Sequence, residues 1–337
     1  MNSISNIKAD LRRWLGQKRY ALMYAGRDRR LASQAEHAQN NWIRTATENL
    51  PELPRSHNVT HEIHMTSGEG QALMGIWSSF SLMRFFDDAR LVLHADASLT
   101  DETLAQWSRI IPDMRIVRHD ETEQMSRDML ASFPNVLNWC QKYHFGSKLG
   151  SVQATASTFR LTDADTDTLT LNDPLIARNC IKSSDWLLAW NLDLRYSYAY
   201  PEQTLRNILG DLLGTLPDRL NGGFLVCFKF TDREWQLLDK VLHRLEQSAE
   251  TDPLRYWMHQ TLLAIVASNL GAAARPLPAP YDIHDGVTRE GQVVRHYVGA
   301  PGIRPRFFTE GIPQLIQDAR KRGHLPEDFC AEHVPLR

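Results

Sequence analysis

The sequence predicts an α/β protein with a central sheet flanked by helices. Residues 59–65 alternate apolar and polar side chains as a strand does, and residues 71–86 carry apolar side chains at helical spacing. Residues 90–94 and 101–110 repeat this order of strand, turn and helix. The order is typical of a doubly wound sheet, in which ligands lie beyond the carboxyl ends of the strands.

The composition is ordinary for a globular protein. Of 337 residues, 42% are hydrophobic and 23% are charged, and the net charge is −2. A charge this close to zero gives no support for a nucleic-acid binder that relies on bulk attraction to phosphate, so we expect no nucleic-acid partner.

No apolar run is long enough to cross a bilayer, and residues 1–20 lack the apolar core of a signal peptide. The four cysteines form no C-x-x-C pair, so we expect neither a zinc knuckle nor a disulfide framework, and a cytoplasmic location.

Residues 1–55 read as a helical N-terminal extension. Apolar residues fall near helical spacing between Ile7 and Met23, and arginines and lysines crowd the polar side. A basic amphipathic segment can lie on an anionic membrane surface, and it can also be a solvated helix packed on its own domain. Pro51, Pro54 and the polar residues that follow indicate a linker, so we place the main domain at residues 56–337.

The helix at residues 101–110 has clear start and stop signals. Ser98 or Thr100 can cap its first turn, acidic residues suit its positive end, and Pro112 ends it. A capped turn explains both hydroxyls without any ligand. Asp96 is a stronger candidate for ligand binding, because it sits at the carboxyl end of a strand.

The rest of the chain continues the alternation of strands and helices. In order, we expect a strand at residues 114–117, helices up to residue 143, a helix at residues 201–216, a turn at residues 221–224, a strand at residues 225–230, a helix opened by a capping box at residues 231–234, and a helix at residues 256–266.

Three acidic residues follow a short strand near the middle of the chain. Phe159 and Leu161 alternate with polar neighbours, and Asp163, Asp165 and Asp167 come next at alternate positions. Carboxylates this close repel one another unless a cation lies among them, and a hard divalent ion such as Mg²⁺ or Mn²⁺ suits them. An acidic surface loop would have the same composition.

The strand, the D-x-D run and the following apolar residues and Pro174 resemble the metal site of GT-A type glycosyltransferases, which use nucleotide-diphosphate sugars. The spacing to Pro174 favours Asp165 and Asp167, whereas the position directly after the strand favours Asp163 and Asp165. Asp165 belongs to both pairs, and the second ligand stays open. The resemblance implies a mixed, mostly parallel sheet, with a nucleotide-binding half at about 56–180 and an acceptor-side half at about 181–337.

Further segments continue the resemblance in order and imply donor-binding residues. The turn after the first strand would touch the nucleotide, and HADASLTDE is similar to a D-D-G-S-x-T-D turn whose acid helps to hold the nucleoside. A lysine before the D-x-D strand would lie near the diphosphate, and an N-G-G turn would bring the backbone close to the donor sugar. The implied residues are Thr66, Ser67, Gly68, Asp96, Lys148, Asn221, Gly222 and Gly223.

Two later segments complete the resemblance. The family often carries an acid followed by Q-T, and here His259 stands in place of the acid, which leaves Gln260 as a substrate contact. L-P-x-x-Y at residues 277–281 and H-Y-x-G at residues 296–299 are similar to the closing portion of these enzymes. In some of them the histidine completes the metal site, so the resemblance implies His296 as a ligand of Mn²⁺ or Mg²⁺.

The resemblance implies transfer of a sugar from a nucleotide-diphosphate donor, with a UDP-sugar favoured, to a hydroxyl of a glycan or another acceptor. A divalent ion stabilises the departing diphosphate, and an inverting enzyme also needs a carboxylate base. Asp193, Asp185 and Asp282 are candidates for that base. Whether the reaction inverts or retains configuration stays open.

Two alternatives share the scaffold. One is a catalytically inactive relative that only binds a sugar nucleotide. The other is a nucleotidyltransferase, for which a basic glycine-rich loop near the N-terminus is expected; TSGEG at residues 66–70 is a poor substitute. The sequence contains neither G-x-G-x-x-G nor a Walker A pattern, so dinucleotide and ATP sites are not indicated.

Overall fold

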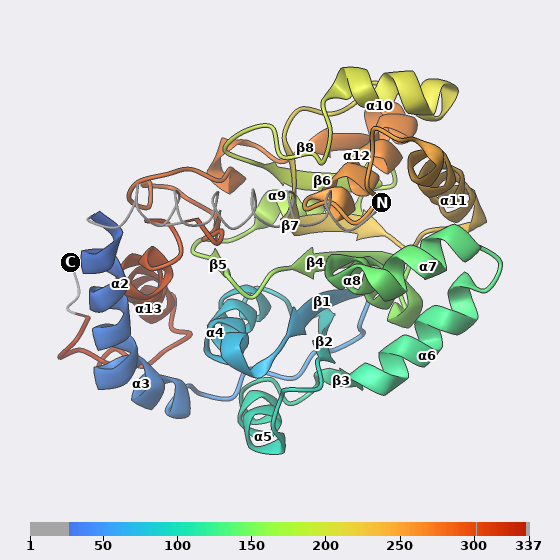
Figure 1. Cartoon of the computed structure of the whole chain (residues 1–337). Helices are drawn as coiled ribbons and strands as arrows, with labels where there is room; N and C mark the ends of the chain where they lie inside the picture. The colour runs from blue at the N-terminus through green and yellow to red at the C-terminus, as the bar shows by residue number, and fades with distance from the viewer. Residues whose placement is uncertain (1–26, 301, 335–337) are drawn as a thin grey trace.

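A seven-stranded mixed sheet forms the centre of the molecule, seen in a computed structural model that describes residues 27–300 and 302–334 (Figure 1). The strand order is β3-β2-β1-β4-β7-β6-β8, and every strand except β7 runs in the same direction. The predicted mostly parallel sheet is therefore confirmed. Its strands are β1 (His61–Ser67), β2 (Ala89–Ala95), β3 (Arg115–Arg118), β4 (Arg160–Ala164), β6 (Leu188–Leu192), β7 (Leu220–Phe228) and β8 (Ala274–Pro276).

Helices cover both faces of the sheet. One face carries α4, α5 and α9, together with α2, α3 and α13 at its edge, and the other carries α7, α8 and α10 to α12, with α6 packed on α8. The described helices are α2 (Arg27–Ala38), α3 (Arg44–Glu48), α4 (Ala72–Met83), α5 (Asp101–Ile110), α6 (His119–Leu130), α7 (Pro134–Lys142), α8 (His144–Thr155), α9 (Leu175–Lys182), α10 (Glu202–Leu209), α11 (Asp232–Gln247), α12 (Met258–Leu270) and α13 (Ile312–Lys321).

Strand β7 shows why two layers of helices are needed. All of its residues are buried. Because successive side chains point to opposite faces, Phe224 and Val226 enter one hydrophobic core while Leu225 and Cys227 enter the other. A strand covered on both faces reads as a nearly continuous apolar run, which is how the sequence at residues 225–230 appears.

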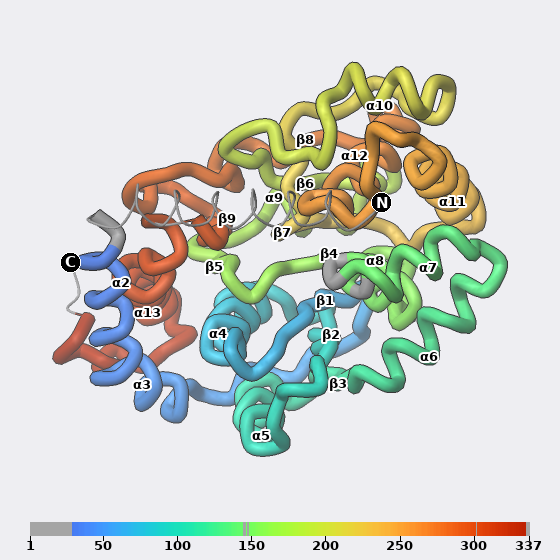
Figure 2. Tube along the Cα trace, viewed as in Figure 1, coloured from blue at the N-terminus to red at the C-terminus, as the bar shows by residue number. Residues whose placement is uncertain are grey.

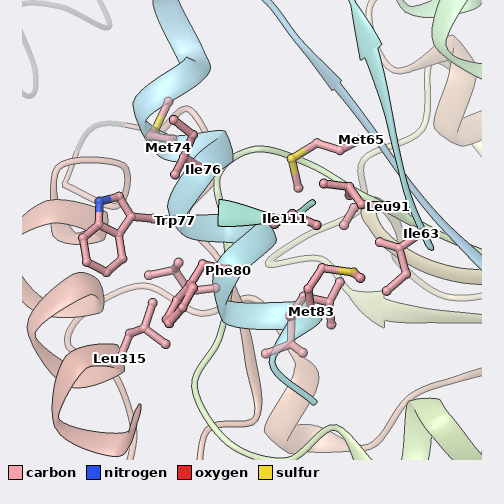
Figure 3. Close-up of a cluster of buried hydrophobic side chains, with 14 of the residues drawn as sticks. Ile63, Met65, Met74, Ile76, Trp77, Phe80, Met83, Leu91, Ile111 and Leu315 are labelled. Carbon is pink, nitrogen blue, oxygen red and sulfur yellow. The ribbon is translucent and has the colours of Figure 1, made fainter. Parts of the chain in front are cut away.

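The core between α4 and the sheet also receives side chains from both ends of the chain. Trp77 and Phe80 of α4 pack beside Leu315 of α13 (Figure 3). Ile43 is fully buried in the same core, and the indole nitrogen of Trp77 donates a hydrogen bond to Thr47 Oγ1 at 2.8 Å. The described part of the N-terminal segment is therefore packed on the main domain.

The helical N-terminal extension is confirmed over residues 27–48. Helix α2 lies beside the turn Phe307–Gly311 that leads into α13, as the chain trace in Figure 2 shows. The basic segment between Ile7 and Met23 lies outside the described residues, and the domain boundaries stay predictions. Within the described residues, no helix combines the length and the hydrophobicity that a transmembrane span requires.

Three local predictions were wrong in detail. The helix predicted at residues 201–216 ends at Leu209, because Gly210 adopts φ 54° and a short 3₁₀ turn follows. Residues 221–223 lie inside strand β7, which begins at Leu220, instead of in a turn before it. They are buried like the rest of the strand, and this burial favours the extended conformation over a turn. Helix α12 begins at Met258, so the two aromatic residues before it are outside the helix.

A separate two-stranded antiparallel sheet stands beside the large one. It pairs β5 (Thr168–Thr170) with β9 (Val294–His296), and its register places Thr168 opposite His296. Strand β5 directly follows the acidic run, and its partner β9 lies more than 120 residues further along the chain.

Candidate active site

A cleft of about 2120 Å³ opens at the carboxyl edge of the parallel strands. Residues at the ends of β1, β2, β4 and β6 line it, because parallel strands end at the same edge of a sheet. Strand β7 runs the other way, so its first residues lie at this edge too. Its antiparallel direction is the reason that Asn221 and Gly223 line the cleft beside Asp165 and Asp193.

Asp165, Asp167 and His296 form a group of three metal-ligand side chains. Their ligand atoms all lie within 4.8 Å of one another. His296 Nε2 lies 3.0 Å from Asp167 Oδ1 and 3.5 Å from Asp165 Oδ2. The pairing of β5 with β9 brings them together, and the backbone N–H of Tyr297 donates to the carbonyl of Asp167 at 2.7 Å. Two carboxylates and one imidazole form a donor set that fits Mn²⁺ or Mg²⁺.

Asn221 fixes the orientation of the His296 ring. The backbone N–H of Gly223 donates to Asn221 Oδ1 at 2.8 Å, so that atom is the acceptor of the amide. His296 Nδ1 lies 2.9 Å from the same oxygen and is therefore the donor. This leaves Nε2 facing the carboxylates, which is the arrangement that a metal-binding histidine needs.

Cationic side chains surround the carboxylates of this group and the neighbouring carboxylate of Asp163. Lys148 Nζ lies 3.1 Å from Asp163 Oδ2 and 2.5 Å from Asp165 Oδ1. Arg304 Nη2 lies 2.6 Å from Asp167 Oδ2. Burial alone would raise the pKa of Asp167, but His296 and Arg304 outweigh it and hold that pKa at about 2. Burial alone would lower the pKa of His296 and of Lys148, but the neighbouring carboxylates raise both.

Asp163 is not part of the metal-ligand group, contrary to the prediction from its position in the sequence. Strand β4 continues to Ala164, so Asp163 lies within the sheet and is buried. Its carboxylate pairs with Lys148. The arrangement therefore favours Asp165 and Asp167 as the D-x-D pair.

Arg304 is a further residue of the site that the sequence patterns do not predict. It lines the cleft and contacts Asp167. The available signal was weak: a single basic residue eight positions after His296. Only the loop that follows β9 brings it back to the acidic group.

The three candidate carboxylates for catalysis separate clearly. Asp193 lines the cleft, and its Oδ2 accepts hydrogen bonds from Asn221 Nδ2 at 2.9 Å and Gln260 Nε2 at 3.5 Å. Asp185 is exposed and bonds to neighbouring serines. Neither Asp185 nor Asp282 is among the described residues that line the cleft, so the geometry does not favour them.

The predicted nucleotide-side residues Thr66, Ser67, Gly68 and Asp96 all line the cleft. Asp96 Oδ1 accepts the backbone N–H of Ser98 at 2.7 Å, and it also accepts the hydroxyl of that serine. Of the two predicted caps, Thr100 is the one that caps α5, because its Oγ1 accepts a backbone N–H of the first turn. Asp96 is thus held by its own turn and faces the cleft.

The predicted substrate contact Gln260 and the neighbouring His259 lie at the start of α12. Gln260 lines the cleft, and its Oε1 accepts the backbone N–H of Gly222 at 3.3 Å. Gly222 itself is not among the described lining residues. Burial lowers the pKa of His259 to about 4, so its ring is neutral near pH 7 and does not replace the family's acid as a charged group.

Comparisons with known proteins identify the fold. No family model matches the sequence, and no curated protein matches it. The chain is similar to the apo structure of WbbM, a bifunctional glycosyltransferase, with 12% identity and a TM-score of 0.50 over 81% of this chain and 52% of that one. It is also similar to the galactosyltransferase LgtC in complex with donor and acceptor sugar analogues, with 13% identity and a TM-score of 0.48 over 74% and 94%. The chain is similar as well to mouse xyloside xylosyltransferase 1 in its apo form, with 13% identity and a TM-score of 0.47 over 72% of this chain and 98% of that one.

Identities this low define the fold and nothing finer. The chain has the GT-A type fold that its sequence motifs predict. A seven-stranded, mostly parallel sheet carries an Asp-x-Asp–His group at its carboxyl edge.

Proposed function

We propose that this protein is a metal-dependent glycosyltransferase that moves a sugar from a nucleotide-diphosphate donor to an acceptor hydroxyl. The observation that carries the proposal is the group of Asp165, Asp167 and His296 at the carboxyl edge of a GT-A type sheet, inside a large cleft. WbbM, which shares the fold, is described as a glycosyltransferase, and this supports the assignment.

Asp165, Asp167 and His296 are the residues that would hold Mn²⁺ or Mg²⁺. A bound divalent ion supplies Lewis-acid stabilisation of the charge on the departing diphosphate. Lys148 and Arg304 already lie on the carboxylates of this group, so their cationic ends are placed to bind phosphate oxygens of the donor. These two side chains are our candidates for orienting the diphosphate.

The remaining cleft residues position the substrates. Thr66 to Gly68 and Asp96 would contact the nucleoside, because they lie at the ends of β1 and β2. Asp193 is held by amide donors of Asn221 and Gln260 next to the metal group. It is our candidate for the carboxylate that acts at the transferred sugar or the acceptor hydroxyl.

The finer assignments remain predictions from the sequence. These are the preference for a UDP-sugar, a glycan as the acceptor, a peripheral membrane contact through the basic N-terminal segment, and a cytoplasmic location. The motif resemblance supports the donor and the acceptor, the basic amphipathic pattern between Ile7 and Met23 supports the membrane contact, and the spacing of the cysteines supports the location.

A donor-binding assay tests the proposal. We expect Mn²⁺ and UDP together to raise the melting temperature more than either alone, and we expect slow hydrolysis of one sugar nucleotide among UDP-, GDP- and CMP-sugars. Asp167→Asn should abolish both effects, whereas Asp185→Asn, at an exposed position outside the described cleft lining, should keep them.

The alternatives give different outcomes in the same assay. Binding of UDP and Mn²⁺ without hydrolysis or transfer would indicate a sugar-nucleotide-binding relative. Release of pyrophosphate from a nucleoside triphosphate and a sugar phosphate would indicate a nucleotidyltransferase. Absence of any Mn²⁺-dependent nucleotide binding would contradict the proposal.

A further inference from the structure

Two adjacent aromatic side chains stand at the rim of the cleft. Tyr256 and Trp257 both line it, and their ring centroids are 5.1 Å apart at an interplanar angle of 58°. The Tyr256 side chain is among the exposed large aromatics of the described residues, with 59% of its surface accessible. Exposed aromatic surface beside a polar cleft is a recurrent feature of binding sites.

The backbone holds Trp257 in a conformation that bulky residues avoid. Its φ of 69° and ψ of 8° lie in the left-handed region, at a cost of about 1–3 kcal/mol for a residue with a side chain. Trp257 is also the N-cap of α12, where its side chain makes no capping hydrogen bond. Asn adopts the left-handed conformation more readily than Trp. The tryptophan therefore occupies a position whose backbone conformation penalises it.

The surrounding contacts account for the retention of this conformation. The carbonyl of Trp257 accepts hydrogen bonds from the backbone N–H of Thr261 at 3.0 Å and from its hydroxyl at 2.9 Å. The carbonyl of Pro253 accepts the indole N–H of Trp139 at 2.8 Å, which anchors the preceding loop on α7. The strained residue is fixed from both sides, and strain of this kind clusters at ligand-binding sites.

The cleft is larger than a single donor needs. Sites for one small ligand usually occupy about 300–1,000 Å³. The cleft measures about 2120 Å³, so it has room for a second substrate beside the nucleotide. The aromatic pair lies beside the Asp193 end, since Gln260, three residues after Trp257, contacts that carboxylate.

We infer that Tyr256 and Trp257 form the acceptor site, and that the acceptor is a pyranose whose apolar face lies on these rings. This inference rests on the proposed function. A pyranose presents C–H groups on its faces and hydroxyls around its edge. Aromatic faces with a polar border match that pattern. Asp193, Arg195 and Ser197 line the neighbouring wall and supply polar partners for the hydroxyls.

Transfer assays with defined sugars test the inference. The probes are methyl α- and β-D-pyranosides of glucose, galactose, mannose and xylose, together with lactose, cellobiose and maltose. Each is offered with the sugar nucleotide that the wild-type protein hydrolyses. We expect transfer to at least one of them, and in Tyr256→Ala we expect its acceptor KM to rise about tenfold or more. Tyr256→Phe should stay close to wild type, because the ring is retained.

Trp257→Asn is a second variant, chosen to separate acceptor binding from stability. We expect its melting temperature to stay near that of the wild type, because relief of the left-handed strain offsets the lost packing. Its acceptor KM should nevertheless rise like that of Tyr256→Ala. Phe159→Ala is the control, since Phe159 is similarly exposed at 55% but is outside the described cleft lining.

Three results would overturn the inference. One is an unchanged acceptor KM in both aromatic variants. The second is donor hydrolysis by the wild type without transfer to any of the sugars. The third is transfer only to a serine-containing peptide or a lipid alcohol. Absence of Mn²⁺-dependent UDP binding in the wild type would instead contradict the proposed function. Failure of the acceptor site and failure of the proposed function are therefore distinguishable.

Discussion

At the scale of single residues, Asn221 connects the metal group to the candidate catalytic carboxylate. Its amide oxygen accepts from Gly223 N–H and His296 Nδ1, while its amide nitrogen donates to Asp193 Oδ2. One side chain thus sets the orientation of a metal ligand and of the carboxylate beside it. Gly223 has a matching requirement, because a Cβ at that position would lie 2.1 Å from the His296 ring.

This connection predicts a loss of metal affinity in Asn221→Ala. Without the amide oxygen, the His296 ring loses the acceptor that fixes Nε2 toward the carboxylates. We expect the apparent affinity for Mn²⁺ to fall by about 10- to 100-fold. Titration of Mn²⁺ in the presence of UDP, followed by thermal shift, measures it. Asn207→Ala, at an exposed position of α10, is the control, and equal affinities in the two variants would contradict the prediction.

A second residue-scale prediction concerns pH and His61. Burial lowers the pKa of His61 to about 4, only partly opposed by Asp88. The unfolded chain binds this proton more readily, so His61 contributes stability above about pH 6.5 that is lost as the pH falls toward 4, by up to about 3 kcal/mol. We expect His61→Leu to flatten the pH dependence of the free energy of unfolding in this window.

Urea denaturation at several pH values between 7.5 and 4.5 measures the slope. His37→Leu, at an exposed position of α2, is the control and should keep the wild-type slope. A slope in His61→Leu as steep as that of the wild type would show that other groups dominate the acid sensitivity.

At the scale of elements, local signals predict where several helices begin. The capping box at the start of α11 is present as predicted: the Thr231 hydroxyl accepts a backbone N–H, and the Glu234 carboxylate accepts the N–H of Thr231. Such caps depend on a few consecutive residues, which is why the sequence predicts them well.

Removing this cap should destabilise the protein without affecting the cleft. We expect Thr231→Ala to lower the free energy of unfolding by about 1 kcal/mol, because the hydroxyl that accepts a backbone N–H in the first turn of α11 is lost. Urea denaturation measures the change, and Thr231→Ser should recover most of it. A change in Mn²⁺ or UDP binding in the alanine variant would contradict the local origin of the effect.

At the scale of the whole molecule, the N-terminal helices share one core with α4 and α13. Ile43, between α2 and α3, is fully buried there. We expect Ile43→Ala to cost about 2–5 kcal/mol, because it leaves a cavity in a packed core. The loss should appear in a single unfolding transition, since residues 27–48 are not packed separately.

Unfolding followed by both far-UV circular dichroism and tryptophan fluorescence tests this prediction. Ile176→Ala is the matched control, because that isoleucine is 40% exposed, and it should cost less than about 0.5 kcal/mol. An earlier, separate transition in Ile43→Ala would show that the N-terminal helices unfold on their own.

The sequence predicts much of the fold because strands and helices reflect periodic patterns of neighbouring residues. The units β1–α4 and β2–α5 follow from such patterns. Two glycines and an asparagine are common turn residues, so the sequence predicts a turn at Asn221 to Gly223. Burial on both faces holds these residues in β7 instead. The left-handed Trp257 had no local signal at all, because tertiary contacts impose it.

For the candidate site, the residue types already define the chemistry of the ligands: a run of acids follows a strand, and a histidine lies far along the chain. The tertiary structure alone decided which residues meet. The register of β5 against β9 sets His296 beside Asp167, the extent of β4 turns Asp163 toward Lys148, and the loop after β9 returns Arg304. These are contacts between segments far apart in the chain, and local patterns carry no information about such pairing.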